Sequence, residues 1–344
     1  NGRPLVACAH SRGSSDSGSD RGGHEANRCR AEGRFMVPGL SSLEAVVVGA
    51  LQGITELFPV SSLGHSVLMP ALIGGQWARD LTVSTPESPY LAFIVGLHVA
   101  TALALLLFFW RDWLAIVGGF VSSIRHRRIS TPPERLAWLI VVATIPVGVA
   151  GLLLEHVFRT VLGRPIPAAG FLIANGLILL GGEALRRRLA RTAQPSTVEA
   201  ETAAAGDTKV LAAPDQRLAS MSMARGLMIG SAQVLALLPG ISRSGVTMVA
   251  GLLRGLSHED AARFSFLLAT PVILAAGVLK VPDLFGPLGA GIHGQIIAGS
   301  IAAFICAYLA LRFLTKYFET RTLTPFAIYC LIAGIGSLAY LTMS

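Results

Sequence analysis

The sequence predicts an all-α polytopic membrane protein built as an inverted-topology repeat, in which each half is a re-entrant helical hairpin followed by three transmembrane helices. Three observations carry this prediction: the scarcity of charge, a motif that occurs twice, and the placement of Lys and Arg. Of the 344 residues, 52% are hydrophobic and 14% are charged, and the mean hydropathy is +0.61. Soluble domains carry roughly 25% charged residues, so this composition indicates a chain that crosses a membrane several times.

The net charge of +8 does not indicate a protein that binds nucleic acid. The basic residues stand in connections between apolar segments, where Lys and Arg set the orientation of a membrane protein. The cysteines lie in the N-terminal head and in apolar segments, without the spacing of a metal site. We therefore expect membrane lipids as partners, no nucleic acid, and no metal site or disulfide framework built from cysteine.

Residues 1–35 form a head of low complexity that is rich in Ser, Gly and charged residues. The head lacks the apolar run of a secretory signal peptide and the apolar content of a core, so we expect it to be disordered. The sequence starts at Asn1, whereas Met36 directly precedes the apolar pattern. We therefore expect Met36 to be the native start and the head to be upstream or non-native sequence.

A motif that occurs twice organises the rest of the chain. Gln52 and Gln233 each follow a Gly-x-x pattern on an apolar helix, and each helix is then broken by proline, glycine and serine. With one residue gapped before the proline, Ser62 aligns with Ser242. Irregular backbone at membrane depth is tolerated only where protein buries it or water reaches it. The two stretches therefore predict one site built from two halves.

Most of the apolar segments have about the 20 residues that cross a bilayer core. The Lys and Arg content of the connections between them indicates their orientation. The connections at 111–135, 186–225 and 312–321 are rich in Arg and Lys and should be cytoplasmic, whereas 155–166 and 282–293 should face out. With this orientation, the first segment of each half enters and leaves on one side of the membrane. The predicted parts are a first repeat at 36–188, with a re-entrant hairpin at 42–75 and spans at 90–110, 135–154 and 167–185; a cytoplasmic linker at 189–222; and a second repeat at 223–344, with a re-entrant hairpin at 223–255 and spans at 262–281, 294–314 and 322–342.

The first motif carries groups for metal binding and acid–base chemistry. Glu56 lies well inside an apolar segment, where a carboxylate costs on the order of 3 kcal/mol and so indicates a function. Gln52 shares its helix face four residues earlier, and the two oxygen ligands suit Mg²⁺ or Ca²⁺. Ser61, Ser62 and His65 follow, and a hydroxyl and an imidazole near a carboxylate suit a nucleophile and a general base.

The second motif carries groups for binding an oxyanion. Arg243 presents a planar fork of donors that matches phosphate oxygens, and a helix that starts after it directs N–H groups at the same loop. The glycines let the backbone approach a ligand closely. We therefore predict a phosphate or diphosphate site made by Arg243 with Gly240, Ser242, Ser244, Gly245 and Thr247.

These two motifs resemble a known family. The pattern Gln52-x-x-x-Glu56 with Pro59-Val60-Ser61-Ser62-x-Gly64-His65, followed by Pro239-Gly240-x-Ser242-Arg243-Ser244-Gly245-x-Thr247, is similar to the undecaprenyl-diphosphatase family, the bacitracin-resistance proteins of bacteria. The similarity extends from about residue 40 to the C-terminus. It implies an enzyme that removes the terminal phosphate of undecaprenyl diphosphate and so recycles the lipid carrier of cell-wall precursors.

The resemblance also implies a location and roles for residues. The protein would lie in the bacterial inner membrane with its site open to the outer face. Its catalytic residues would be Glu56, Ser62, His65 and Arg243, with a divalent metal, Mg²⁺ or Ca²⁺, at Gln52 and Glu56. Its diphosphate would be bound by Arg243 with Ser61, Gly240, Ser242, Ser244, Gly245 and Thr247.

Several alternatives stay open at this stage. Ser62, His65 or a water molecule could be the nucleophile. A flippase that moves a polyprenyl phosphate would need the Arg243 loop, but would not need the acid and nucleophile of the first motif. His98 lies on an apolar span and is interpreted as the partner in a hydrogen bond between helices. The sequence does not decide between a monomer and a homodimer, and it does not set the length of the lipid.

Overall fold

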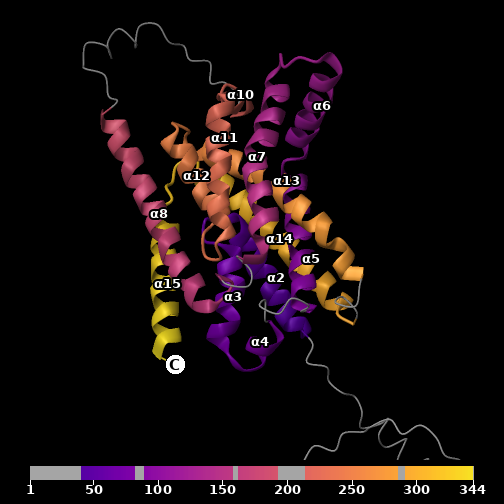
Figure 1. Ribbon diagram of the computed structural model, residues 1–344, viewed down its shortest axis with the longest axis vertical. Helices are drawn as coiled ribbons and strands as arrows, with labels where there is room; N and C mark the ends of the chain where they lie inside the picture. The colour runs from indigo at the N-terminus through magenta and orange to yellow at the C-terminus, as the bar shows by residue number, and fades with distance from the viewer. Residues whose placement is uncertain (1–39, 82–88, 158–161, 193–213, 286–290, 344) are drawn as a thin grey trace, which may run out of the picture. The chain divides into compact units, whose positions relative to one another are not determined.

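The computed structural model describes residues 40–81, 89–157, 162–192, 214–285 and 291–343, and within these ranges the regular structure is entirely helical (Figure 1). Among the described residues, five helices are long and apolar enough to cross a membrane, or six when a bent pair counts as one span. The prediction of an all-α polytopic membrane protein is therefore confirmed. The predicted head and most of the predicted linker lie outside the described residues.

Among the described elements, six helices are long and apolar, and the others are shorter. The long helices are α5 (Pro89–Phe108), α7 (Pro132–Val157), α8 (Pro165–Thr192), α13 (His258–Phe285), α14 (His293–Tyr317) and α15 (Thr324–Met343). The shorter elements are α2 (Ser42–Leu57), α3 (Ser62–Ile73), α4 (Gly75–Asp80), α6 (Trp110–His126), α10 (Pro214–Ala219), α11 (Met223–Ser231), the 3₁₀ helix η2 (Ala232–Leu237) and α12 (Arg243–Leu253).

Helix α6 occupies much of the Arg-rich connection that follows α5. The chain bends by 87° between α5 and α6, and α6 then packs against α7. At Gly119 a Cβ atom would lie 2.8 Å from the backbone nitrogen of Glu134, so only a glycine allows this approach. One face of α6 is buried and the other carries exposed apolar side chains. Its 17 residues include Arg111, Asp112 and Arg125, so the helix lacks the long apolar run of a span, and the sequence therefore did not reveal it.

Helix α2 begins with a capping box. The Ser41 hydroxyl accepts the Glu44 N–H at 3.2 Å, and the Glu44 carboxylate accepts the Ser41 N–H at 2.8 Å. The helix then packs on α14 through glycines four residues apart, as small residues allow in membranes. A Cβ atom at Gly49 would lie 2.2 Å from the Gly299 carbonyl oxygen, and one at Gly53 would lie 2.3 Å from that of Ala303.

The two motifs end in loops that lead into α3 and α12. Ser61 caps α3 by accepting the Gly64 N–H at 3.2 Å, and Ser242 caps α12 by accepting the Gly245 N–H at 3.2 Å. Both caps follow the glutamine of their motif at the same distance in sequence. Ser61 is therefore the counterpart of Ser242, and the alignment of Ser62 with Ser242 through a gap is wrong.

Candidate active site

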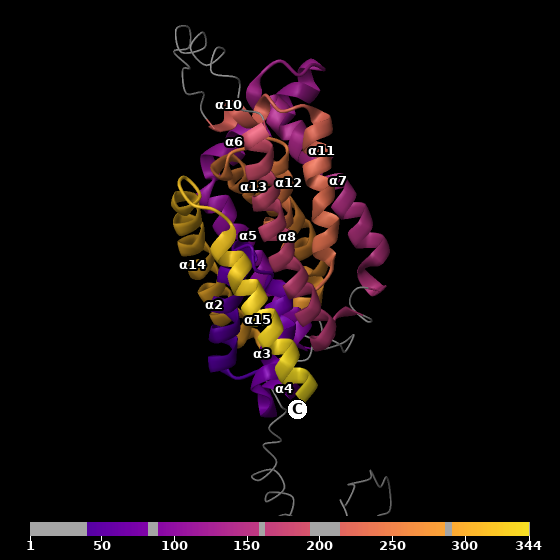
Figure 2. The same ribbon diagram turned by 90° about the vertical axis from the view of Figure 1, so that its left-hand side faces the viewer.

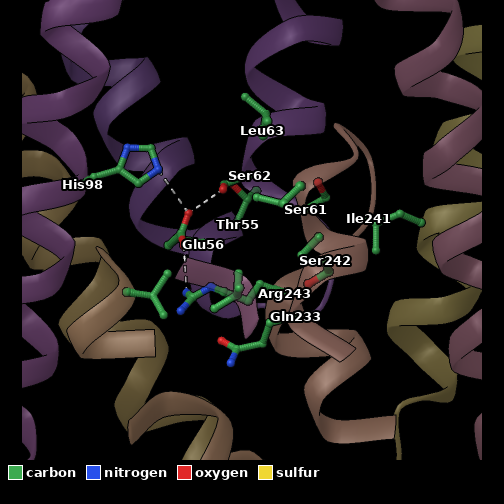
Figure 3. A pocket seen from close by; sticks show the side chains of 14 residues that line it. Thr55, Glu56, Ser61, Ser62, Leu63, His98, Gln233, Ile241, Ser242 and Arg243 are labelled. Carbon is green, nitrogen blue, oxygen red and sulfur yellow. Dashed lines mark hydrogen bonds and ion pairs between the residues drawn. The ribbon is translucent and has the colours of Figure 1, made fainter. Parts of the chain in front are cut away.

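A cavity of about 170 Å³ lies where the two loops meet (Figure 3). Its walls come from α2, α3, α5, α7, α13 and the stretch from η2 to α12. One part of the lining is apolar and includes Val147 and Val272. The polar part combines both motifs and consists of Thr55, Glu56, Ser61, Ser62, His98, Gln233, Ser242 and Arg243.

Glu56 stands at the centre of the polar lining, with 8% of its side chain exposed. Its Oε1 accepts a hydrogen bond from Arg243 Nη2 at 2.9 Å, and its Oε2 accepts one from Ser62 Oγ at 2.5 Å. Gln52 Nε2 also donates to Oε2, at 3.1 Å. A buried carboxylate needs such partners, and removal of one partner from a buried ion pair is strongly destabilising. The structure therefore brings Gln52, Glu56 and Ser62 of the first motif together with Arg243 of the second.

Arg243 has unused donor capacity in this cavity. Only 13% of its side chain is exposed, and Nη2 is occupied by Glu56. Its Nη1 is buried and has no hydrogen-bond partner among the described residues. An unmade hydrogen bond of a buried group costs about 1–3 kcal/mol, and more when the group is charged. The free side of the guanidinium is therefore suited to an anionic acceptor such as a phosphate oxygen.

Asn175 of α8 ties the two loops together. It is fully buried. Its Nδ2 donates to the Pro59 carbonyl of the first loop at 3.0 Å, and its Oδ1 accepts the Ser242 N–H of the second loop at 3.0 Å. The only sequence signal for this role is an amide within an apolar span, and Asn175 was not among the predicted site residues. Through these two bonds, Asn175 fixes the loops that carry Ser62 and Arg243.

Ser61 links the loops in a second way. Its φ of 72° is unusual for a residue other than glycine, and such conformations gather at functional sites. Its hydroxyl accepts the Gly240 N–H of the second loop at 3.2 Å. Gly240 has a φ of 118°, and a Cβ atom there would lie 2.5 Å from the Ala168 carbonyl oxygen, so the position requires glycine. Ser61 and Gly240 thus serve the architecture of the site.

His65, which the sequence analysis placed among the catalytic residues, lies apart from the cavity lining. His65 Nδ1 donates to the Ser61 carbonyl at 2.6 Å, its Nε2 bonds the Tyr329 hydroxyl at 2.7 Å, and the ring stacks on Tyr329. His65 is not among the residues that line the cavity. The imidazole beside Glu56 is that of His98, whose Nε2 lies 3.6 Å from Glu56 Oε2 (Figure 3).

His98 also contacts Gln52, with 3.3 Å between Nε2 and the amide nitrogen, while its Nδ1 donates to the Ile94 carbonyl at 2.9 Å. This tautomer leaves Nε2 free to accept from Gln52. The contact joins α5 to α2, as expected for a hydrogen bond between helices. It also places a titratable ring in the wall of the cavity, which its apolar surroundings in the sequence did not indicate.

The remaining hydroxyl groups of the second motif support the loops. Ser244 Oγ donates to the Phe58 carbonyl at 3.2 Å and lies 3.0 Å from Ser242 Oγ. Thr247 Oγ1 donates to the Arg243 carbonyl at 2.7 Å. Ser242 lines the cavity, whereas Ser244, Gly245 and Thr247 are not among the lining residues. The roles predicted for these three residues in binding substrate stay predictions.

The predicted metal ligands are adjacent but few. Gln52 and Glu56 lie within hydrogen-bonding distance, whereas no group of three or more His, Cys, Asp or Glu side chains in the described ranges could hold a metal ion. Mg²⁺ is commonly bound by one or two carboxylates together with water and substrate phosphates. The donor set fits a cation that shares its ligands with a bound diphosphate, and does not fit a site made by protein alone.

Comparison with known proteins assigns this chain to a family. A family described as bacitracin resistance protein BacA matches residues 45–336. An undecaprenyl-diphosphatase of Mycolicibacterium paratuberculosis is 69% identical over 308 residues, which cover 90% of this chain and 100% of that protein. Undecaprenyl-diphosphatase 1 of Frankia casuarinae is 52% identical, covering 86% of this chain and 96% of that protein, and an undecaprenyl-diphosphatase of Granulibacter bethesdensis is 42% identical, covering 89% and 98%. The chain therefore belongs to the bacitracin resistance protein BacA family.

Proposed function

We propose that this chain hydrolyses undecaprenyl diphosphate to undecaprenyl phosphate and phosphate, and so recycles the lipid that carries cell-wall precursors. The observation that carries the proposal is one buried carboxylate, Glu56, that holds Ser62 on one oxygen and Arg243 on the other. This arrangement supplies a base, a nucleophile and an anion-binding group in one cavity. The names of the relatives at 69% and 52% identity support the same reaction.

The geometry favours Ser62 as the nucleophile. Glu56 accepts the proton of Ser62 Oγ while this oxygen attacks the terminal phosphorus, and the bond from phosphorus to the bridging oxygen breaks. The electron pair leaves with undecaprenyl phosphate, and the proton on Glu56 passes to this product, which restores the carboxylate. Water then attacks the phosphoserine while Glu56 takes a proton from that water. The bond from phosphorus to Ser62 Oγ breaks, Glu56 returns this proton to Ser62 Oγ, and phosphate departs. His65 is a weaker candidate, since both its ring nitrogens are engaged outside the cavity lining.

In this scheme, Arg243 binds the terminal phosphate and stabilises its negative charge. Its free Nη1 donates to an oxygen of the terminal phosphate, while Nη2 donates to Glu56 and keeps it in place. Preorganised donors of this kind are worth most where water is excluded. A divalent cation, Mg²⁺ or Ca²⁺, would be held by Glu56 and the Gln52 amide together with the diphosphate, and when bound it neutralises diphosphate charge.

The proposal includes an inverted repeat with the site open to the outer face of the inner membrane. Helix packing supports the repeat. Gly49 on α2 contacts α14, whereas Gly230, which holds the same place in the second motif, contacts α7, where its Cβ would lie 2.0 Å from the Ala143 carbonyl oxygen. Each motif helix thus packs on the second long helix of the other half. The third long helices, α8 and α15, run side by side (Figures 1 and 2). A two-fold relation between halves produces such exchanges.

Phosphate release from undecaprenyl diphosphate by purified protein in detergent tests this function. We expect release by the wild type in the presence of Mg²⁺ or Ca²⁺, loss on addition of EDTA, and loss in Glu56→Ala and Arg243→Ala. Arg254→Ala is a matched control, because Arg254 is exposed at the other end of α12. Lipid movement across vesicles without phosphate release would instead support a flippase.

A further inference from the structure

An apolar groove of about 420 Å³ runs along the outside of α7. All of its lining residues except Pro271 of α13 belong to α7. Three α7 side chains in the groove are strongly exposed: Ile145 at 55%, Val149 at 52% and Leu152 at 76%. The groove is therefore open to the surroundings of a membrane helix, in contrast to the buried cavity at Glu56.

Hydrocarbon is the chemistry that this groove accepts. Its one polar side chain is that of Thr144, and the Thr144 hydroxyl donates to the Ile140 carbonyl of its own helix at 2.7 Å. The hydroxyl is thereby satisfied, and what remains is a surface of methyl and methylene groups. A charged head group would find no partner here, whereas an aliphatic chain loses nothing by entering.

The groove and the catalytic cavity share their walls. Val147 and Val272 line the cavity, while their neighbours in sequence, Gly148 and Pro271, line the groove. Val147 is buried, and Gly148 is exposed. The cavity and the groove therefore adjoin along α7 and α13, one residue apart on each helix. Because the groove extends from Ile140 to Leu152, it is roughly 18 Å long at about 1.5 Å per helical residue.

We propose that this groove holds the first isoprene units of the lipid whose diphosphate occupies the catalytic cavity. The inference rests on the proposed function, since it takes the polyprenyl diphosphate as the ligand. A molecule with an anionic head and a long apolar tail needs a polar cavity and an adjoining apolar path, and here the two lie back to back. The occupant is thus the tail of the substrate, not an arbitrary membrane lipid.

Gly148 offers a way to block the groove without disturbing the fold. Apart from its chain neighbours and the backbone of its own helix, a Cβ atom at Gly148 would have no heavy atom within 4 Å, so a side chain there extends into open space. Gly181 of α8 is a matched control, because it too lies on a long apolar helix, is exposed, and would meet nothing within 4 Å. Gly148→Phe fills the groove, and Gly181→Phe adds the same ring elsewhere.

The first test compares phosphate release from undecaprenyl diphosphate with release from a five-carbon prenyl diphosphate, whose tail is too short to fill the groove. We expect Gly148→Phe to raise KM for the long substrate at least tenfold and to leave kcat/KM for the short one within twofold. Gly181→Phe should change neither. Equal kinetics of Gly148→Phe and wild type on the long substrate would overturn the groove while leaving the phosphatase intact; no release by wild type would overturn the phosphatase.

The second test reads binding directly and does not depend on turnover. A photoreactive p-benzoylphenylalanine replaces Ile145 in the groove or Leu177 on α8, which is exposed to a similar extent. We expect Ile145→p-benzoylphenylalanine to cross-link radiolabelled undecaprenyl phosphate, with the label displaced by unlabelled long-chain lipid and retained with the five-carbon compound. Equal labelling from both positions that long-chain lipid does not displace would show bulk lipid only and overturn the proposal.

Discussion

Asn175 gives the sharpest test of how the site is held, because one side chain bonds both loops. Asn175→Ala leaves the Ser242 N–H without its acceptor and leaves the Pro59 carbonyl with only the weak bond from Cys330 Sγ at 3.9 Å; each lost hydrogen bond of a buried group costs about 1–3 kcal/mol. The total is about 2–6 kcal/mol, shared between stability and the position of the loops. Since a misplacement near 1 Å costs about 10²-fold in rate, we expect kcat/KM for phosphate release to fall on the order of 10²-fold.

Asn175→Asp separates the two hydrogen bonds. A carboxylate still accepts the Ser242 N–H, but it cannot donate to the Pro59 carbonyl. We expect activity to fall for this isosteric change as well, with a lower thermal unfolding midpoint in detergent. Thr101→Val is the control, because Thr101 is equally buried and its hydroxyl bonds only its own helix. Asn175→Ala with kcat/KM within threefold of the wild type would refute the bridging role.

Three further predictions concern the nucleophile, the metal and the packing of α2. Ser62→Ala should lower kcat on the order of 10³-fold or more and abolish an acid-stable phosphoenzyme trapped with labelled substrate; retained activity would assign the attack to water. Gln52→Glu adds a second carboxylate, so half-maximal activity in a Mg²⁺ titration should need about tenfold less metal, equivalent to roughly 1.4 kcal/mol; an unchanged titration would remove residue 52 from the metal site. Gly53→Ala puts a Cβ atom 2.3 Å from the Ala303 carbonyl oxygen, which should destabilise the protein by about 1–3 kcal/mol, seen as a lower thermal midpoint that Gly336→Ala, in open space, does not share.

Composition and segment length were sufficient to predict a helical membrane protein. The hydrocarbon core of a bilayer requires both few charges and apolar runs of about 20 residues. The same reasoning did not reveal α6. Its apolar stretch is too short for a span, and its Arg residues resemble those of an ordinary connection. The 3₁₀ form of η2 was equally hidden, because the sequence reads as a continuous apolar helix from Met223 to Leu237.

The core of the site could be predicted because its charges lie where charges are costly. Glu56 and Arg243 are charged residues within the two re-entrant hairpins predicted from the sequence, which indicated a functional role, and the structure shows that they form an ion pair. Asn175 and His98 were missed or given another role, since a single polar residue on an apolar span has many structural explanations. Only the fold shows that Asn175 faces both loops and that His98 faces Glu56, whereas His65 faces Tyr329.

With the corrected correspondence of the two motifs, equivalent positions carry different chemical groups at the cavity. With Ser61 matched to Ser242, Ser62 is the counterpart of Arg243, and each is the first residue of the helix that follows its loop. Equal positions therefore bring a hydroxyl and a guanidinium to the cavity from opposite sides. Glu56 has no acidic counterpart, because Leu237 holds its place in the second motif. One carboxylate thus contacts both groups, and the two equivalent pairs that differ, Glu56 with Leu237 and Ser62 with Arg243, give the two halves their different chemistry.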